Sequence, residues 1–295
     1  MIYDVSHRTT FEYSQNVSIS HHLLHLTPRD SRHQVCRRSG QIVEPAPTVS
    51  HSGRDYFGNP VTNLTIQESH AKLIVHATST VEVTPAAPPD SAATMPWDQV
   101  HREMAGSANP EILNAFQFAF DSPFTRNGDG AADYAFPSFP PGRPVLEAAV
   151  ELMGRIHGEF KYEGGVTDVS TPIDQVLADR RGVCQDFAHL QIACLRSLGL
   201  PARYVSGYVL TRPPEGQAKL VGSDASHAWL AVWCPGQGWI DLDPTNNLIP
   251  RDEHVTLAWG RDYGDVSPVN GLVVGGGEHK VSVAVDVVPA GTYGG

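Results

Sequence analysis

Residues 181–201 read RGVCQDFAHLQIACLRSLGLP, and this stretch decides how the rest of the chain is organised. Apolar residues recur at helical spacing from about Cys184 to Leu198. Gly199 can adopt the left-handed conformation that ends a helix, and Pro201 cannot continue one. The stretch therefore predicts a helix that begins at Cys184 and carries this cysteine in its first turn.

The sequence on either side of this helix predicts a mixed α+β fold. Downstream, three apolar segments favour strands at 203–210, 227–233 and 239–242. Upstream, apolar residues at helical spacing between 145 and 156 follow Pro144, which suits the first turn of another helix.

The two ends of the chain have the pattern of strands. Residues 73–83 alternate between apolar and polar side chains, as do residues 281–287 in the tail. Three prolines, Pro85, Pro88 and Pro89, break the first pattern and predict a linker. We therefore expect four regions: a β-rich N-terminal domain (1–90), a helical and loop connection (91–144), a catalytic core (145–270) and a C-terminal β-strand tail (271–295).

Composition excludes several classes of protein. The 295 residues carry a formal net charge of −11, which argues against a nucleic-acid partner, because phosphate binding needs a positive surface. Four cysteines are too few for a disulfide scaffold, and none has CxxC spacing. Neither a signal peptide nor an apolar run of membrane length is visible. We expect a cytoplasmic protein with reduced thiols and no membrane partner.

Cys184 is the cysteine whose position favours chemistry. A helix start exposes unpaired backbone N–H groups and the positive end of the helix dipole, and both stabilise a thiolate. Arg180 and Arg181 act in the same direction. The alternative is a buried structural cysteine, the usual state of a free thiol. Cys36, Cys194 and Cys234 are interpreted as structural.

His227 and Asp243 are candidates for the partners of this thiol. His227 opens a predicted strand, and Asp243 ends another at an Asp-Pro step, where proline stops ladder pairing. Antiparallel strands joined by a turn at 235–238 would bring both residues to one end of a sheet. Counting outward from that turn leaves a mismatch of three positions, so we expect a bulge or an asymmetric loop.

Together these residues form a known type of nucleophilic site. A histidine accepts the thiol proton, and an acidic residue fixes its tautomer and supports the imidazolium. The thiolate can then attack an amide or ester carbonyl. The backbone N–H of Cys184, at the start of the helix, is a candidate donor to the oxyanion.

With these motifs in place, the sequence resembles the transglutaminase-like superfamily. The matching segments are 182–189 (GVCQDFAH), 226–229 (SHAW) and 238–245 (GWIDLDPT), with weaker likeness at 198–203 and 260–266. The resemblance covers most of the chain and is strongest between about 145 and 270. The opening β region looks like the N-terminal region that precedes this core in bacterial members.

The resemblance implies a papain-like core, in which the cysteine-bearing helix packs on an antiparallel sheet, and a Cys-His-Asp triad. Cys184 would be the nucleophile, His227 the base and Asp243 the orienting acid. Asp241 is the rival for the third role, but the family places its acid immediately before Pro-Thr. Eukaryotic relatives use calcium; no Asp-rich loop of EF-hand spacing is seen here, so no metal or cofactor is predicted.

Other residues are candidates for the substrate cleft or the core. Tyr162 is a candidate cleft wall. Gln185 and Asp186 would line the cleft or cap the helix, and Trp229 and Trp239 would pack in the core or shield the triad. His189 is interpreted as a structural hydrogen-bonding histidine. The remaining histidine cluster, at positions 21, 22 and 25, is interpreted as polar surface rather than a metal site.

The function expected from the sequence is acyl transfer through a thioester on Cys184, with a peptide or protein as substrate. Hydrolysis is favoured over transamidation, because no feature indicates a dedicated amine site. The alternatives are a crosslinking protein-glutamine transamidase and a non-catalytic peptide-binding module on the same fold. A zinc hydrolase would need ligands that the sequence does not indicate. The N-terminal β region is a possible platform for a homo-oligomer.

Overall fold

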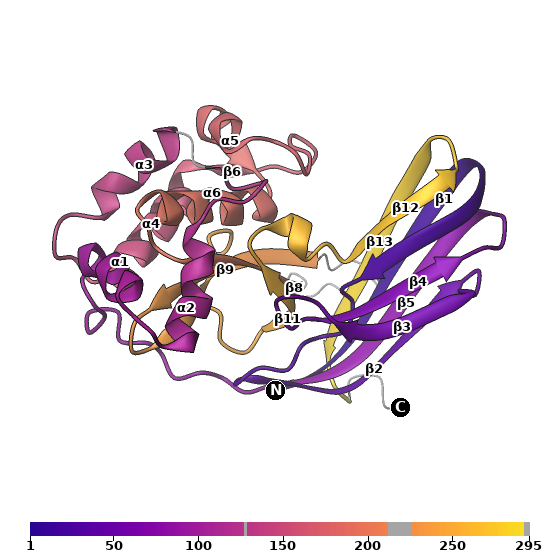
Figure 1. Ribbon diagram of the computed structural model, residues 1–295, viewed down its shortest axis with the longest axis horizontal. Coiled ribbons are helices and arrows are strands. Elements are labelled where there is room, and N and C mark those ends of the chain that lie inside the picture. Colours follow the sequence, from indigo (N-terminus) through magenta and orange to yellow (C-terminus); the bar gives the residue numbers. More distant parts are fainter. Residues whose placement is uncertain (127–128, 212–225, 292–295) are drawn as a thin grey trace, which may run out of the picture.

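The computed structural model describes residues 1–126, 129–211 and 226–291. A seven-stranded sheet built mainly from the N-terminal residues forms one side of the molecule, and a mixed helical and β part forms the other (Figure 1). The predicted α+β class and the β-rich N-terminal region are confirmed.

A single long strand organises the seven-stranded sheet. Strand β1 (Ile2–Leu24) pairs antiparallel with four neighbours, two along each edge. Its first half lies between β5 and β13, and its second half lies between β4 and β12. The other strands are β2 (Gln34–Glu44), β3 (Val49–Arg54), β4 (Pro60–Ile66), β5 (His70–Val83), β12 (Val269–Gly275) and β13 (His279–Pro289).

The C-terminal strands therefore belong to the same sheet as the N-terminus. Strand β13 pairs with β1 from Tyr3–Pro289 to Tyr13–His279. Of the alternating valines predicted for one face of the tail, Val285 and Val287 are buried, whereas Val281 and Val283 are about half exposed. Alternation predicted the strand, but the pattern of one strand does not identify a partner more than 260 residues away.

The second part packs helices against a four-stranded antiparallel sheet of order β10-β9-β8-β11. Its strands are β8 (Ala202–Val209), β9 (Ser226–Cys234), β10 (Gly238–Leu242) and β11 (His254–Gly260). The helices are α1 (Trp97–Ala105), α2 (Pro110–Phe116), α3 (Asp129–Ala135), α4 (Val145–Glu159), α5 (Ile173–Asp179) and α6 (Cys184–Ser197), with short 3₁₀ turns at Gln117–Ala119, Phe136–Ser138 and Tyr263–Asp265.

Helix α6 is the centre of this part, as the sequence predicts. Buried residues lie on every side of it, which is typical of a helix enclosed by a core. The buried guanidinium of Arg196 fixes its C-terminal end by donating to the backbone carbonyls of Phe118, Ala202 and Arg261. The start of α6, and with it Cys184, is thereby held in a fixed place relative to the sheet.

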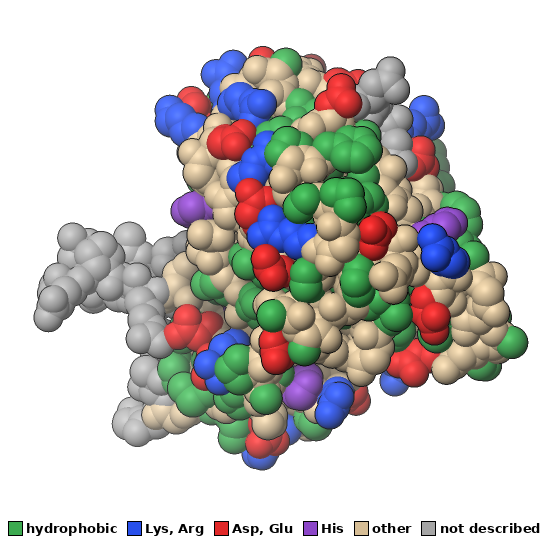
Figure 2. All heavy atoms as spheres, turned by 90° about the vertical axis from the view of Figure 1, so that its left-hand side faces the viewer, with side chains coloured by type: hydrophobic (Ala, Val, Ile, Leu, Met, Phe, Trp, Pro, Cys, Tyr) green, Lys and Arg blue, Asp and Glu red, His purple; other side chains and the backbone are tan. Residues whose placement is uncertain are grey.

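The largest hydrophobic cluster extends across both parts. Tyr3 and Val5 of β1 and Val285 and Val287 of β13 belong to the same buried cluster as residues of α4, α6 and β8. On the helical face of the molecule, basic and acidic side chains are interspersed (Figure 2). Within the described residues, every helix is too short or too polar to span a bilayer.

Candidate active site

Cys184 is the first residue of α6, and the preceding turn is built around a cap. The Asp186 carboxylate accepts hydrogen bonds from the backbone N–H of Val183 and the hydroxyl of Thr167, each at 2.7 Å. A Cβ at Gly182 would lie 2.7 Å from this carboxylate, so the position needs glycine. Of the two roles predicted for Asp186, the contacts match the cap, and the half-buried Cys184 is left at the open end of the helix.

Tyr162 is held beside Cys184 by a short parallel pairing. Strand β6 (Lys161–Tyr162) pairs with β7 (Arg181–Gly182), with Tyr162 opposite Gly182. The phenol ring lies edge-on against Phe187, one helical turn beyond Cys184, at 6.3 Å between ring centroids. Burial raises the pKa of the Tyr162 hydroxyl, and so do the negative charges of Cys184 and Asp186. Tyr162 therefore lies beside the helix start and is 57% exposed, and its role as a cleft wall stays a prediction.

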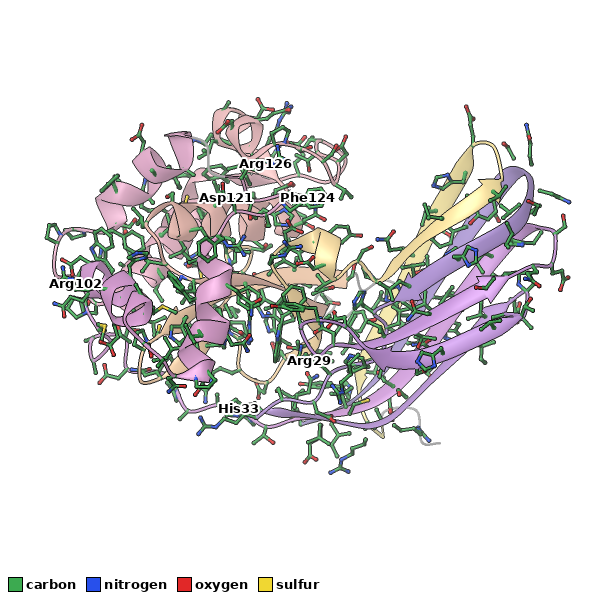
Figure 3. All side chains as sticks on the ribbon, in the orientation of Figure 1. Arg29, His33, Arg102, Asp121, Phe124 and Arg126 are labelled. Atoms are coloured by element: carbon green, nitrogen blue, oxygen red, sulfur yellow. The ribbon has the colours of Figure 1, made fainter. Side chains whose placement is uncertain are left out.

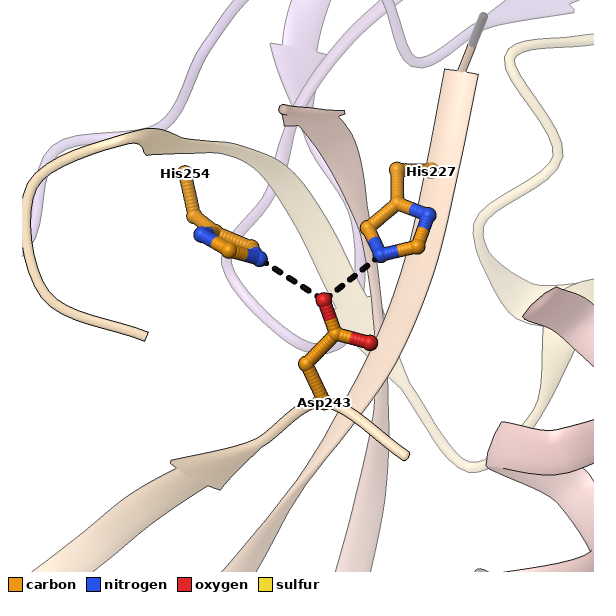
Figure 4. A group of neighbouring side chains, drawn as sticks. All are labelled: His227, Asp243 and His254. Carbon is orange, nitrogen blue, oxygen red and sulfur yellow. Dashed lines mark hydrogen bonds and ion pairs between the residues drawn. The ribbon is translucent and has the colours of Figure 1, made fainter. Parts of the chain in front are cut away.

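His227 and Asp243 come together without the bulge expected from the sequence. The ladder between β9 and β10, which lies wholly in the described residues, is regular from Gly238–Cys234 to Leu242–Leu230. The turn is centred on Gly236 rather than between Gly236 and Gln237, which reduces the mismatch from three positions to two, and the two side chains reach diagonally across that offset. His227 Nε2 donates to Asp243 Oδ2 at 2.8 Å (Figure 4).

Two further residues hold the same carboxylate. His254 Nε2 donates to Asp243 Oδ2 at 2.9 Å, and Asn246 Nδ2 donates to that oxygen at 2.7 Å (Figure 4 shows the two histidines). The other oxygen, Oδ1, accepts from the backbone N–H groups of Thr245 and Asn246. Sequence reasoning missed His254 and Asn246. For Asn246, the available signal was its position four residues after Leu242, the last apolar residue of β10.

The electrostatics of the group favour a charged pair. Burial alone would lower the pKa of His227, but hydrogen bonds to Asp243 and Cys184, and the negative charges of both, raise it overall. Burial alone would raise the pKa of Asp243, but hydrogen bonds from His227 and His254 lower it overall. Because His227 Nε2 faces Asp243, its Nδ1 is the nitrogen left for the sulfur of Cys184.

His227, Asp243 and His254 also place their ligand-type atoms within 4.8 Å of one another. Two imidazoles and a carboxylate are a donor set that suits zinc. In this arrangement, however, the nitrogens face the shared oxygen at hydrogen-bond distances of 2.8 and 2.9 Å, and Asn246 donates to it as well. That geometry requires protons on both nitrogens, whereas a metal ligand must present a lone pair.

The two candidate tryptophans have different positions. Trp229 is buried and stacks on His227 at 6.0 Å, and it meets His254 edge-on at 5.1 Å. Trp239 packs instead on Phe118 and Trp233 beside the hairpin turn. Four residues of extended strand, about 13 Å, separate Trp239 from Asp243. Of the two roles predicted for Trp239, these contacts match packing in the core rather than shielding of the triad.

The remaining residues singled out in the sequence match their predictions to different degrees. His22 and His25, expected on the polar surface, are buried. The side-chain amide of Gln185 donates to the carbonyl of Val169 at 3.4 Å, on a loop beside the helix start. Asp241 faces the charge of Arg203 rather than His227. His189 is buried, its Nε2 accepts from the backbone N–H of Tyr263, and burial lowers its pKa to about 3. A neutral acceptor of this kind agrees with the structural role predicted for His189.

Known sequences match the chain over nearly its whole length. Residues 3–82 match the bacterial transglutaminase-like N-terminal region, and residues 138–244 match the transglutaminase-like superfamily. An uncharacterized protein of Mycobacterium tuberculosis is 40% identical, over 97% of this chain and 92% of its own. A protein-glutamine gamma-glutamyltransferase of Pseudomonas aeruginosa is also 40% identical, but only over 27% of this chain and 12% of its own.

A solved structure has the same fold. A candidate cysteine protease of Cytophaga hutchinsonii superposes with a TM-score of 0.77, covering 99% of this chain and 91% of its own at 22% identity. The match extends over the N-terminal sheet as well as the helical part.

Proposed function

The chain belongs to the transglutaminase-like superfamily, and on that basis we propose that it is a cysteine acyl-transfer enzyme acting on a peptide or carboxamide bond. The observation that carries the proposal is His227 held by Asp243 at 2.8 Å while its other nitrogen is left for Cys184 at a helix start. A peptide or protein is the proposed substrate. A reducing compartment such as the cytoplasm would keep Cys184 as the free thiol that the reaction needs.

The proposed reaction has two halves. The Cys184 thiolate attacks the carbonyl carbon, and the C–N bond breaks as protonated His227 gives its proton to the leaving nitrogen. The product of this half is a thioester on Cys184 and a free amine or ammonia. In the second half, His227 takes a proton from water or from an acceptor amine, which attacks the thioester and releases Cys184.

The oxyanion formed in each half needs donors. The backbone N–H of Cys184 is one, because residues in the first turn of a helix have no intrahelical partner. We propose the hydroxyl of Tyr162 as the second. Tyr162 pairs with Gly182, two residues before Cys184, and this places it beside the start of the helix. Burial raises the pKa of its hydroxyl, so the group stays a proton donor at neutral pH.

Hydrolysis remains the favoured outcome, with transamidation as the alternative. The likeness to a protein-glutamine gamma-glutamyltransferase over 27% of the chain supports the alternative. A glutamine-containing peptide library, incubated with the protein and a dansylated amine, separates the two. Hydrolysis releases ammonia or peptide fragments without the label, and transamidation attaches the label to glutamine.

Mass spectrometry of the same mixtures tests the shared step. A peptide adduct on Cys184, released by hydroxylamine and missing from Cys184→Ala, identifies the acyl donor. If no peptide acylates Cys184 while the library binds with unchanged affinity to Cys184→Ala, the protein is a non-catalytic peptide-binding module.

A further inference from the structure

The N-terminal sheet contacts the catalytic part along the edge of strand β11. This strand is the last one of the sheet order β10-β9-β8-β11, so its outer edge offers backbone N–H and C=O groups to a partner. It begins at His254, the residue that shares the Asp243 carboxylate with His227.

Two side-chain amides from the N-terminal region occupy that edge. Gln34, at the start of β2, donates from Nε2 to the carbonyl of Thr256 at 2.7 Å and accepts from the N–H of Thr256 at 2.8 Å. Asn59 makes the same double contact with Trp259, at 2.9 and 3.0 Å. Each amide thus replaces one residue of a neighbouring strand.

The spacing of these contacts fits the shape of β11. The pairing of β11 with β8 is irregular between Thr256 and Ala258, which inserts one extra residue. Outward-facing backbone groups therefore fall three residues apart, at 256 and 259, where Gln34 and Asn59 meet them. The side chains of Gln34 and Asn59 are buried, with exposed fractions of 4% and 0%. If either contact is lost, the backbone N–H and C=O groups of β11 that it satisfied have no water to replace it.

The two amides are themselves fixed. Gln34 also donates to the carbonyl of Arg29, and Asn59 donates to the Asp55 carboxylate at 2.6 Å. The guanidinium of Arg29 lies over the ring of Trp259, 3.0 Å from its centroid, at the junction of the two parts (Figure 3). A rigid patch of the N-terminal region thus holds β11 on one side, and β8 holds it on the other.

From these contacts we propose that the N-terminal sheet is part of the catalytic apparatus, with Gln34 and Asn59 as positioning residues. They hold β11 in place, β11 places His254, and His254 helps to orient Asp243 toward His227. Thr256 is two residues from His254, so loss of the Gln34 contact allows the start of the strand to shift. The proposal builds on the pairing of Cys184 with His227, which is also part of the proposed function.

The test compares two substitutions of the same kind on strand β2. Gln34→Leu removes the amide that contacts β11. Gln41→Leu is the matched control, because the Gln41 amide donates to Thr27 within the N-terminal region. For each full-length variant, the rate of iodoacetamide alkylation at Cys184 is measured across pH by peptide mass spectrometry, and thermal stability is measured in parallel.

We expect Gln34→Leu to slow alkylation of Cys184 at neutral pH by about threefold to thirtyfold, the range typical of coupling through packed elements. Gln41→Leu stays within about twofold of the parent. The deciding measurement is a double-mutant cycle: in a His254→Phe background, Gln34→Leu causes no further loss, because the residue it acts through is gone. If Gln34→Leu does not fold, Gln34→Glu, which keeps the acceptor and loses the donor, takes its place in the cycle.

Equal rates for the two leucine variants would overturn the proposal, and so would an undiminished effect of Gln34→Leu in the His254→Phe background. Alkylation needs no substrate, so the result is independent of the acyl-transfer assay. A protein that shows the coupling but never forms a thioester would keep this inference and lose the proposed function.

Discussion

His254 and His227 donate to one oxygen of Asp243, at 2.9 and 2.8 Å, from strands on opposite sides of β8. The carboxylate therefore acts as a fixed point between the two strands, β9 and β11, and its direction is set by more than His227 alone.

The first prediction concerns this shared acceptor. His254→Phe removes one donor from a buried carboxylate, and hydrogen bonds to charged groups contribute about 1.5–3 kcal/mol. We expect kcat/KM to fall by about tenfold to a hundredfold, with most of the loss in kcat, since His254 is buried and acts through Asp243. His51→Phe is the control, because His51 is an exposed residue of β3. A parent-like kcat for His254→Phe would show that His227 and Asn246 orient Asp243 without it.

The second prediction separates the oxyanion donor from the nucleophile. Tyr162→Phe keeps the ring on Phe187 and removes the hydroxyl. Acylation of Cys184 by an activated ester should slow by about a hundredfold to a thousandfold, the cost of one oxyanion donor. Alkylation by iodoacetamide, which forms no oxyanion, should keep its rate. Tyr56→Phe, at an exposed tyrosine, is the control. A parallel loss in both reactions would assign Tyr162 to packing instead.

The third prediction concerns acid stability. Burial lowers the pKa of His7 and His22 to about 4, with smaller contributions from His76 to the first and from His70 and His21 to the second, and it lowers that of His189 to about 3. Below pH about 6.5 the unfolded chain binds protons at these residues and the folded chain does not, so stability falls as pH falls. The pKa of His227 is raised instead, so its contribution to stability is fully present well below pH about 6.5, where both states are protonated, and falls as pH rises above that value.

Each of these three histidines contributes a slope of up to about 1.4 kcal/mol per pH unit between pH about 6 and 4.5. Urea unfolding at several pH values measures the total, and His7→Phe should reduce the slope by one histidine's share. A free energy of unfolding that is flat from pH 7 to pH 5 would contradict the assignment of these residues as buried and neutral.

The sequence predicts much of this site because its strongest signals are local. Helix α6 and strands β8, β9 and β10 fall within about two residues of their predicted bounds, since periodicity, Gly199 and Pro201 mark them. The pairing of His227 with Asp243 followed from the positions of both residues at strand ends.

What the sequence does not indicate depends on contacts between distant segments. His254 precedes an apolar strand whose place at the sheet edge is set by β8 and the N-terminal region. Gln34 and Asn59 are residue types that commonly occur in loops and at strand ends, so nothing in the sequence distinguishes them. Only the fold brings them to β11. The register of β9 and β10 depends on where the turn is centred, and counting outward from Gly236 and Gln237 displaces that register by one position.

The reactivity of Cys184 tests the central claim most directly. The rate of iodoacetamide alkylation at this residue, measured from pH 5 to pH 10 in the parent and in His227→Ala, reports the thiolate–imidazolium pair. The account predicts rapid alkylation already at pH about 6 in the parent and at least a tenfold loss there in His227→Ala. An alkylation profile that rises only near pH 8.5, the same in both proteins, would contradict it.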